Sequence, residues 1–430
     1  MNIVLTPEKS AVSANPESPF HVLVRVQAPQ DDMLTSIPLN VAVVLDRSGS
    51  MQGAPLAEAK RCVRYLVDRL SEADQVAIVI YDSTVDTLLE VAPAAVAQAQ
   101  IAVPLGLVKT GGCTDLHAGW LAGAELLAPH TGEQALSRVI LLSDGQANEG
   151  LTDVGQITQQ VAGLAQAGVT TTTVGLGRNF NEFLMTAMAQ AGQGMAHYGE
   201  RAEDLFETFE SELGLLKNLA WRDVTASLSG TAQAEIANRY TQVQGQWRLP
   251  AIAAGAEAWA LIRIPASAVH ELAQGGSGLA VTIRAADRDG AVHEFSQKLS
   301  VLDVVSSERY AALQPDALVA RRMIELQAAE IQFAAGDAVR AGDWYRVEML
   351  LRDLTVLAAD HPWLAASLSH LRHLLAERDQ ALMSKELHYK SVSLNARLSA
   401  IDEDDFNAIA ESAAPSYLRR KVSQGRRTQT

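Results

Sequence analysis

The chain has 430 residues, more than one compact hydrophobic core usually holds, which indicates two or three domains. Its formal net charge of −15 disfavours nonspecific binding to nucleic acid or anionic membranes, because such binding relies on clustered Lys and Arg. No apolar run approaches the ~20 residues of a membrane span, and the first residues lack the basic and apolar segments of a secretory signal. We therefore expect a cytoplasmic protein without a membrane span.

The first predicted elements are strands near residues 3–5 and 22–26, where Val22, Val24 and Val26 alternate with other side chains. From residue 36 to 216, predicted strands and helices alternate, which favours a doubly wound, Rossmann-like α/β domain with a mostly parallel sheet. We expect strands at 40–45, 75–81, 85–91, 138–143, 169–174 and 196–198, and helices at 55–70, 94–107, 116–127, 154–167 and 180–191.

Side-chain oxygens gather where three of these segments end or begin. Asp46, Ser48 and Ser50 follow an apolar strand at alternate positions, Thr114 follows a pair of glycines, and Asp144 follows another apolar strand. The carboxyl ends of parallel strands converge, so these side chains are expected at one edge of the sheet. Hard cations such as Mg²⁺ take oxygen ligands in near-octahedral geometry. We therefore predict a metal site there, with Thr114 and Asp144 at the ends of exposed loops.

This motif set resembles the von Willebrand factor type A domain with its metal-ion-dependent adhesion site, over residues 38–213. The resemblance implies that Ser48 and Ser50 bind the metal directly. It implies that Asp46, Thr114 and Asp144 bind it directly or through water, with Mg²⁺ as the ion and Mn²⁺ or Ca²⁺ as substitutes. Asp115 stands where the family often has Asn.

Other interpretations of the same residues are weaker. Asp and Ser at a strand end can simply cap the next helix. A haloacid-dehalogenase-type phosphatase needs a second acid two positions after the first, where this chain has Ser48, and no Gly-Lys-Ser/Thr of a phosphate loop follows the glycines. The chain has two cysteines, Cys62 and Cys113, which indicate no disulfide framework. We expect Cys113 to be a small packing residue.

Residues 217–305 change character, with short alternating strands expected at 224–228, 246–249, 259–264, 279–284 and 294–301, as in a β-sandwich. We infer that the strands of residues 1–35 join this β-sandwich, so that the type A domain of residues 36–216 is an insertion in it. Both connections would then enter the sheet at the end away from Asp46.

Residues 306–400 carry helical patterns at 311–335, 344–358 and 363–383, which predict a helical domain without strands. His370, His373 and His388 fall in this region, but no Cys or acid at ligand spacing supports a metal cluster. Residues 401–430 hold an acidic run followed by basic residues and predict a disordered tail. Within it, Ser423 and Thr428 follow basic residues, as in substrates of basophilic kinases, and are candidate phosphorylation sites.

This domain order is similar to bacterial multidomain type A proteins and to relatives of the inter-α-trypsin inhibitor and chloride-channel-regulator kinds. The leading hypothesis is a non-enzymatic interaction module, whose metal ion binds an Asp or Glu carboxylate of a partner protein. Binding would change the shape of the domain, and the helix ending near Leu213 would transmit this change to the β-sandwich. A metal-dependent hydrolase is an alternative, although its possible bases, His117 and Glu149, are poorly placed. A scaffold subunit of a chaperone-ATPase or of a kinase and phosphatase system is another. The oligomeric state stays open.

Overall fold

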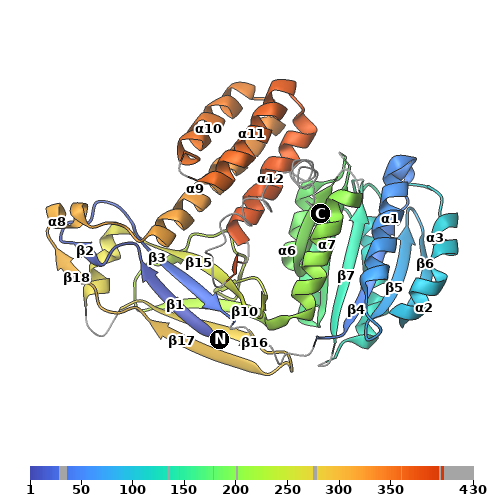
Figure 1. Cartoon of the computed structure of the whole chain (residues 1–430), viewed down its shortest axis with the longest axis horizontal. Helices are drawn as coiled ribbons and strands as arrows, with labels where there is room; N and C mark the ends of the chain where they lie inside the picture. Colours follow the sequence, from blue (N-terminus) through green and yellow to red (C-terminus); the bar gives the residue numbers. More distant parts are fainter. Residues whose placement is uncertain are drawn as a thin grey trace, which may run out of the picture. The chain divides into compact units, whose positions relative to one another are not determined.

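The computed structural model describes residues 1–400, apart from 29–35, 133–134, 145, 178, 200–201, 275–277, 360 and 397–398. The chain divides into two compact units: residues 34–218 form one, and residues 1–33 together with the chain from Leu219 onward form the other. Figure 1 shows the sheets and helices of both units. Among the described residues, no helix is both long and apolar enough to cross a membrane.

The unit of residues 34–218 has one six-stranded sheet of order β6-β5-β4-β7-β8-β9, in which only β6 runs antiparallel to its neighbour. The strands are β4 (Leu39–Asp46), β5 (Gln75–Tyr81), β6 (Val85–Pro93), β7 (Leu136–Ser143), β8 (Val169–Leu176) and β9 (Gln193–Gly199). All eight residues of β4 are buried, as expected for a central strand covered on both faces.

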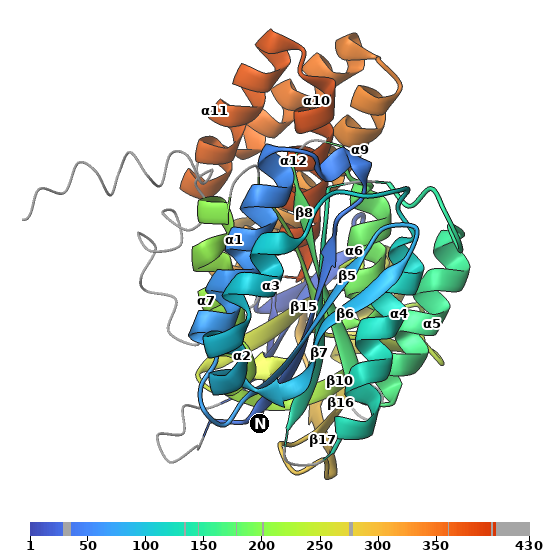
Figure 2. The ribbon, with the colours of Figure 1, turned by 90° about the vertical axis from the view of Figure 1, so that its right-hand side faces the viewer.

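Helices cover both faces of this sheet (Figure 2). One face carries α1 (Ala54–Arg69), α2 (Ala94–Gln100), α3 (Ala102–Leu107) and α7 (Ala202–Lys217), which share one apolar core with the sheet. The other carries α4 (Leu116–Leu127), α5 (Val154–Gln166) and α6 (Glu182–Ala191). Short 3-10 turns lie at Gly49–Met51 and Ala128–His130. The alternating pattern therefore predicted the α/β fold, although the helix expected at 94–107 is divided at Ile101.

The chain enters and leaves this unit at the end of the sheet opposite Asp46. β4 runs from Leu39 to Asp46, and the Ile37 amide donates to the carbonyl of Lys217, the last residue of α7, at 3.1 Å. Asp74 links the same two segments, because one of its oxygens accepts from the Leu39 amide at 2.9 Å and the other pairs with Lys217 Nζ at 2.9 Å. Among the described residues, the entering and leaving segments therefore lie at the opposite end of the sheet from Asp46.

In the described part of the second unit, two larger sheets and one two-stranded sheet surround an apolar core. In the first, β1 (Asn2–Pro7), β3 (Phe20–Gln27), β15 (Ala256–Ile264) and β11 (Glu235–Ile236) lie side by side, and β19 (Ser399–Ala400) pairs with β15. In the second the order is β12 (Gln242–Val243), β13 (Gln246–Arg248), β10 (Leu219–Ser229), β16 (Ala280–Ala286) and β17 (Val292–Lys298), and β14 (Ile252–Ala253) pairs with β10. β2 (Ala11–Ser13) and β18 (Asp303–Val305) form a small parallel pair.

A helical region follows, made of α8 (Ser307–Ala312), α9 (Ala317–Arg340), α10 (Trp344–Leu357), α11 (Pro362–Glu377) and α12 (Gln380–Ala396). An eight-residue 3-10 helix, Ala266–Ala273, belongs to the sheet region before it. The last four helices share a core, and α9 also packs on the outer face of the first sheet, where Leu326 meets Trp259 and Leu261.

Three helical expectations were wrong. The helix expected at 311–335 is divided between α8 and α9 around Pro315, because proline disfavours a helical residue before it. The helix expected at 363–383 ends at Glu377, because the next residue, Arg378, has φ +51°, and Asp379 then caps α12 by accepting from the Leu382 amide. The region also contains a strand, β19, which no pattern predicted.

Candidate metal site

The site begins with Asp46 at the carboxyl end of β4. Its side chain is fully buried, and both oxygens have donors: the Ser48 amide donates to Oδ1 at 2.8 Å, and Ser143 Oγ donates to Oδ2 at 2.6 Å. Ser143 ends β7, the strand beside β4, so its hydroxyl reaches across the sheet edge. The sequence analysis did not single out Ser143, although it directly precedes Asp144.

The hydroxyls of Ser48 and Ser50 connect the Asp46 loop to the second carboxylate, Asp144. Ser48 Oγ and Ser50 Oγ lie 3.1 Å apart, and Ser50 Oγ donates to Asp144 Oδ1 at 2.9 Å. Four of the five predicted residues are therefore joined by hydrogen bonds, and they come from the ends of two neighbouring parallel strands. This is the convergence that the sequence predicted.

Thr114 joins the site through its backbone. The loop before α4 lies against the Asp46 loop, because the Gly49 amide donates to the Gly112 carbonyl at 2.9 Å. It also lies against the loop after β7, where Asn148 Oδ1 accepts from the Thr114 amide at 2.8 Å. Thr114 and Asp144 are 3% and 4% exposed, so the expectation that they end exposed loops was wrong. The three converging loops cover both side chains.

The electrostatics of the site favour a cation. Burial raises the pKa of Asp144 to about 6; the hydrogen bond from Ser50 opposes this, and the nearby Asp46 charge adds to it. Burial also raises the pKa of Asp46, against the hydrogen bonds from Ser143 and Ser48. Tyr81, fully buried beside Asp46, has its pKa raised well above its ordinary value by burial and by that carboxylate. A cation would oppose all three shifts, because it favours the charged form of each group.

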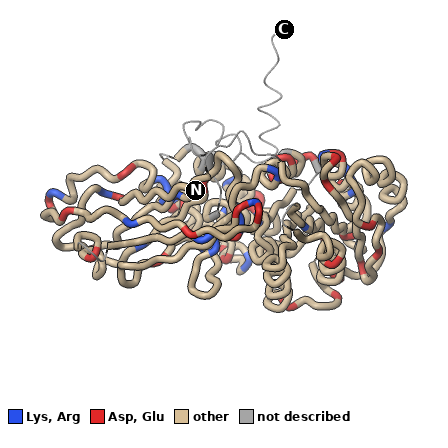
Figure 3. Tube along the Cα trace, turned by 90° about the horizontal axis from the view of Figure 1, so that it is seen from below, with Lys and Arg blue, Asp and Glu red and all other residues tan. Residues whose placement is uncertain are grey.

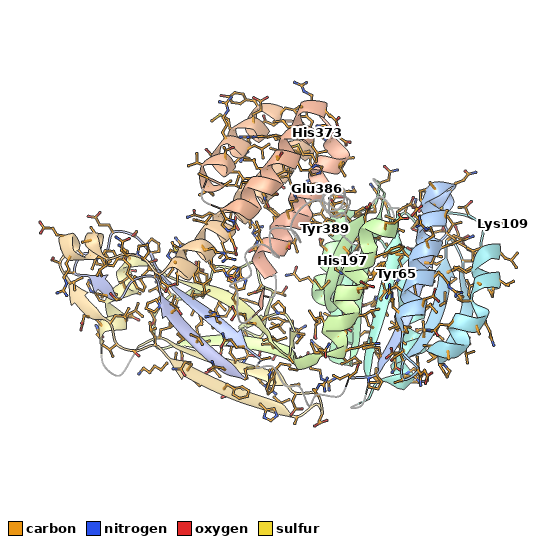
Figure 4. The ribbon with its side chains drawn as sticks, viewed as in Figure 1. Tyr65, Lys109, His197, His373, Glu386 and Tyr389 are labelled. Atoms are coloured by element: carbon orange, nitrogen blue, oxygen red, sulfur yellow. The ribbon has the colours of Figure 1, made fainter. Side chains whose placement is uncertain are left out.

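The donor set fits a hard divalent ion. Two carboxylates and three hydroxyls supply oxygen only, which suits Mg²⁺ and related ions. In the described part of the chain, no group of three or more His, Cys, Asp and Glu residues could hold a metal ion, and His370, His373 and His388 form no such group. His370 instead lies 3.5 Å from Glu386, and His373, labelled in Figure 4, lies 3.4 Å from Glu377 on its own helix.

The remaining expectations concern His117, the two cysteines and the C-terminal tail. His117 points to α5, where its Nε2 lies 2.8 Å from Gln160 Oε1. Cys113 is exposed, so the expectation that it packs in a core was wrong, while Cys62 is buried. Ser423 and Thr428 lie outside the described residues. Figure 3 shows acidic and basic residues interspersed along the trace.

Comparison with known proteins agrees with this fold. A protein of Synechocystis, sll0103, is 28% identical over 234 residues, which cover 54% of this chain and 55% of that protein. Inter-alpha-trypsin inhibitor heavy chain H3 of Mesocricetus auratus is 28% identical over 197 residues, covering 42% of this chain and 22% of that protein. This chain therefore spans about half of the first relative and about a fifth of the second.

Among solved structures, a von Willebrand factor type A protein from Catenulispora acidiphila superposes with a TM-score of 0.65. The two sequences are 18% identical, and the match covers 92% of this chain and 96% of that one. The shared fold therefore extends beyond residues 34–218. Residues 40–211 match the von Willebrand factor type A domain family. The chain thus contains a von Willebrand factor type A domain, which holds Asp46, Ser48, Ser50, Thr114 and Asp144.

Proposed function

We propose that this type A domain binds Mg²⁺, with Mn²⁺ or Ca²⁺ as substitutes, through Asp46, Ser48, Ser50, Thr114 and Asp144. The observation that carries the proposal is the hydrogen-bonded chain from Asp46 through both serines to Asp144, with two buried carboxylates whose pKa values are raised. A divalent ion among these oxygens would supply a positive centre at the edge of the sheet. The protein's own residues hold it and limit the access of water.

The bound ion would recognise a carboxylate of a partner protein. Type A domains are protein-interaction modules, and an Asp or Glu oxygen matches a hard cation in charge and hardness. The negative net charge of the chain would otherwise repel an acidic partner, so the ion is what makes such a contact favourable. The protein works in this proposal as a non-enzymatic cytoplasmic binding module.

A conformational change on partner binding would be transmitted from the type A domain to the β-sandwich through the connecting chain. The type A domain is, in this proposal, inserted in a β-sandwich made by the strands of residues 1–28 and 219–305. Pairing of β3 with β15 along their length supports this. Helix α7 ends at Lys217, and β10 begins at Leu219, so a shift of α7 would pull directly on a strand of the second unit.

The test is capture of partners from native lysate in Mg²⁺ or in EDTA. We expect partners that are held by the wild-type protein in Mg²⁺ and lost in EDTA, and that Asp46→Ala does not hold. Asp68→Ala, an exposed carboxylate on α1 paired with Arg64, is the matched control and should hold them. Amidation of the partner's carboxylates should abolish capture, whereas acetylation of its lysines should not. Capture that persists in EDTA would contradict the proposal.

A further inference from the structure

Residues 111–115, the part of the loop that carries Thr114, are fixed to their surroundings at every amide. Five successive backbone N–H groups each donate to an acceptor outside the loop: Gly111 to the Arg47 carbonyl (2.8 Å), Gly112 to Asp82 Oδ2 (3.3 Å), Cys113 to Ser83 Oγ (2.9 Å), Thr114 to Asn148 Oδ1 (2.8 Å) and Asp115 to the Asp82 carbonyl (3.0 Å). Exposed loops commonly leave such groups to water. Here protein atoms from three other segments accept all five.

Three of the acceptors are side chains, so particular residues create this arrangement. Asp82 and Ser83 follow β5, and Asn148 belongs to the connection between β7 and α5. Asn148 forms a reciprocal contact, because its own amide donates back to the Thr114 carbonyl at 3.2 Å. Thr114 is therefore held on both sides of its Cα by the same residue.

The two glycines fit the same arrangement. A Cβ on Gly111 would lie 1.8 Å from Asp82 Oδ2, and a Cβ on Gly112 would lie 2.5 Å from Ser83 Oγ. Only glycine lets the loop come this close to the two acceptors. The hydrogen bonds to Asp82 and Ser83 therefore depend on glycine at both positions.

Asp82 is itself fixed in its accepting position. The Thr84 amide and hydroxyl donate to its Oδ1 at 2.8 and 2.9 Å, and Arg47 Nε lies 3.2 Å from its Oδ2. Burial would raise the pKa of Asp82, but the hydrogen bonds from Thr84 and Gly112 and the Arg47 charge lower it below its ordinary value. The carboxylate stays ionised, and a charged acceptor makes the stronger hydrogen bond.

We propose that Asp82, Ser83 and Asn148 are positioning residues, which hold Thr114 in its metal-binding place before the ion arrives. This inference rests on the proposed function, because it assigns these residues to the same metal site. A preorganised ligand loses less conformational freedom on binding, so the site gains affinity without any additional ligand. Residues that orient metal ligands commonly change metal affinity by about 10–100-fold when replaced.

The first test follows amide hydrogen exchange in the metal-free protein. We expect slow exchange at residues 111–115 in the wild type. Asn148→Ala should speed exchange at Thr114, and Ser83→Ala should speed it at Cys113. Ser83→Thr, which keeps the accepting hydroxyl, should restore protection. Fast exchange across the loop in the wild-type protein would overturn the inference.

The second test measures Mn²⁺ affinity from the electron paramagnetic resonance signal of the free ion. We expect Ser83→Ala combined with Asn148→Ala to raise the Kd about tenfold. Asp153→Ala is the matched control, because it removes a comparable bond, to the Gln156 amide, from the same connection. It should lower the melting temperature and leave the Mn²⁺ Kd within about twofold of the wild type. Ser83→Thr should restore the affinity lost in Ser83→Ala.

The outcomes separate this inference from the proposed function. Suppose that the wild type binds Mn²⁺ and that Ser48→Ala with Ser50→Ala abolishes binding, but that the Ser83 and Asn148 variants bind as the wild type does. The metal site then stands, and the positioning role is overturned. A wild-type protein that binds no Mn²⁺ overturns the proposed function, and the exchange rates then still decide whether these residues fix the loop.

Discussion

Glu212 on α7 and Arg138 on β7 form a buried ion pair, with 3.0 Å between Oε1 and Nη1 and side chains only 3% and 7% exposed. The other Glu212 oxygen lies 2.8 Å from His197 Nε2 of β9, a residue labelled in Figure 4. Thr172 of β8 donates to Glu212 as well. One carboxylate therefore fixes α7, the helix that precedes β10, to three neighbouring strands.

Replacing Glu212 should destabilise the type A domain strongly. Glu212→Gln leaves the Arg138 charge buried without its partner, and breaking a buried pair in this way costs about 3–5 kcal/mol. The matched control lies on the same helix: Glu210 pairs with Arg69 while both side chains are about half exposed. Glu210→Gln should cost about 1 kcal/mol or less. Urea denaturation measures both, and equal losses would contradict a special role for Glu212.

The same residue predicts how stability depends on pH. Burial would raise the pKa of Glu212, but the bond to His197 and the charges of His197 and Arg138 lower it below its ordinary value of 4.5. Because the folded-state pKa is below the unfolded one, the stabilisation is complete above the unfolded pKa and is lost as the pH falls through the folded pKa. The urea midpoint of the wild type should therefore fall more steeply below about pH 4.5 than that of Glu212→Gln. Parallel curves would contradict this assignment.

Metal binding should raise the melting temperature. An ion that binds only the folded protein stabilises it by RT ln(1 + [L]/Kd), about 2.7 kcal/mol at 100-fold excess over Kd. We expect Mg²⁺ or Mn²⁺ to produce this shift in the wild type and none in Ser48→Ala with Ser50→Ala. Calorimetry with and without EDTA measures it. An unchanged metal response in the double variant would place the ion elsewhere.

Thr114 should matter more for partner binding than for folding. Thr114→Ala removes one hydroxyl and one methyl from a buried site but keeps the backbone bonds to Asn148 and Glu149, so we expect a cost of about 1 kcal/mol. Partner affinity at saturating metal should fall, while Thr114→Ser, which keeps the hydroxyl, should bind nearly as the wild type does. Titration calorimetry with a captured partner measures this. A Thr114→Ala chain that does not fold would show that the residue is structural.

Removal of residues 1–35 should make the rest of the chain insoluble. β3 pairs with β15 along eight residues, from Phe20 opposite Ile264 to Gln27 opposite Glu257. A chain that begins at residue 36 would expose this edge of β15 and the apolar core beneath it, and such edges promote aggregation. Residues 36–216 alone should stay soluble and bind metal. A soluble, monomeric and cooperatively melting chain of residues 36–430 would contradict the prediction.

Local pattern was enough for much of the type A domain. β5 and α4 begin and end at the residues that the sequence predicts, because their apolar periodicity and the cap at Asp115 are encoded within a few positions. Local pattern was not enough in the helical region. There, the left-handed turn at Arg378 has no glycine to mark it. Helix α12 buries the polar side chains of Lys385, Glu386 and His388, so its buried face does not show as a row of apolar residues in the sequence.

The sequence by itself determined which oxygens the site can use, since Asp46 ends one buried strand, Ser48 and Ser50 follow it, and Asp144 directly follows another. Tertiary structure alone decided what holds them. Ser143 reaches Asp46 across 97 positions, Asn148 reaches the Thr114 amide across 34, and Glu212 reaches Arg138 across 74. The periodicity of apolar residues shows only on which face of its own helix or strand a residue lies. Partners that meet through the closure of long loops leave no such local signal, because folding of the whole core brings them together.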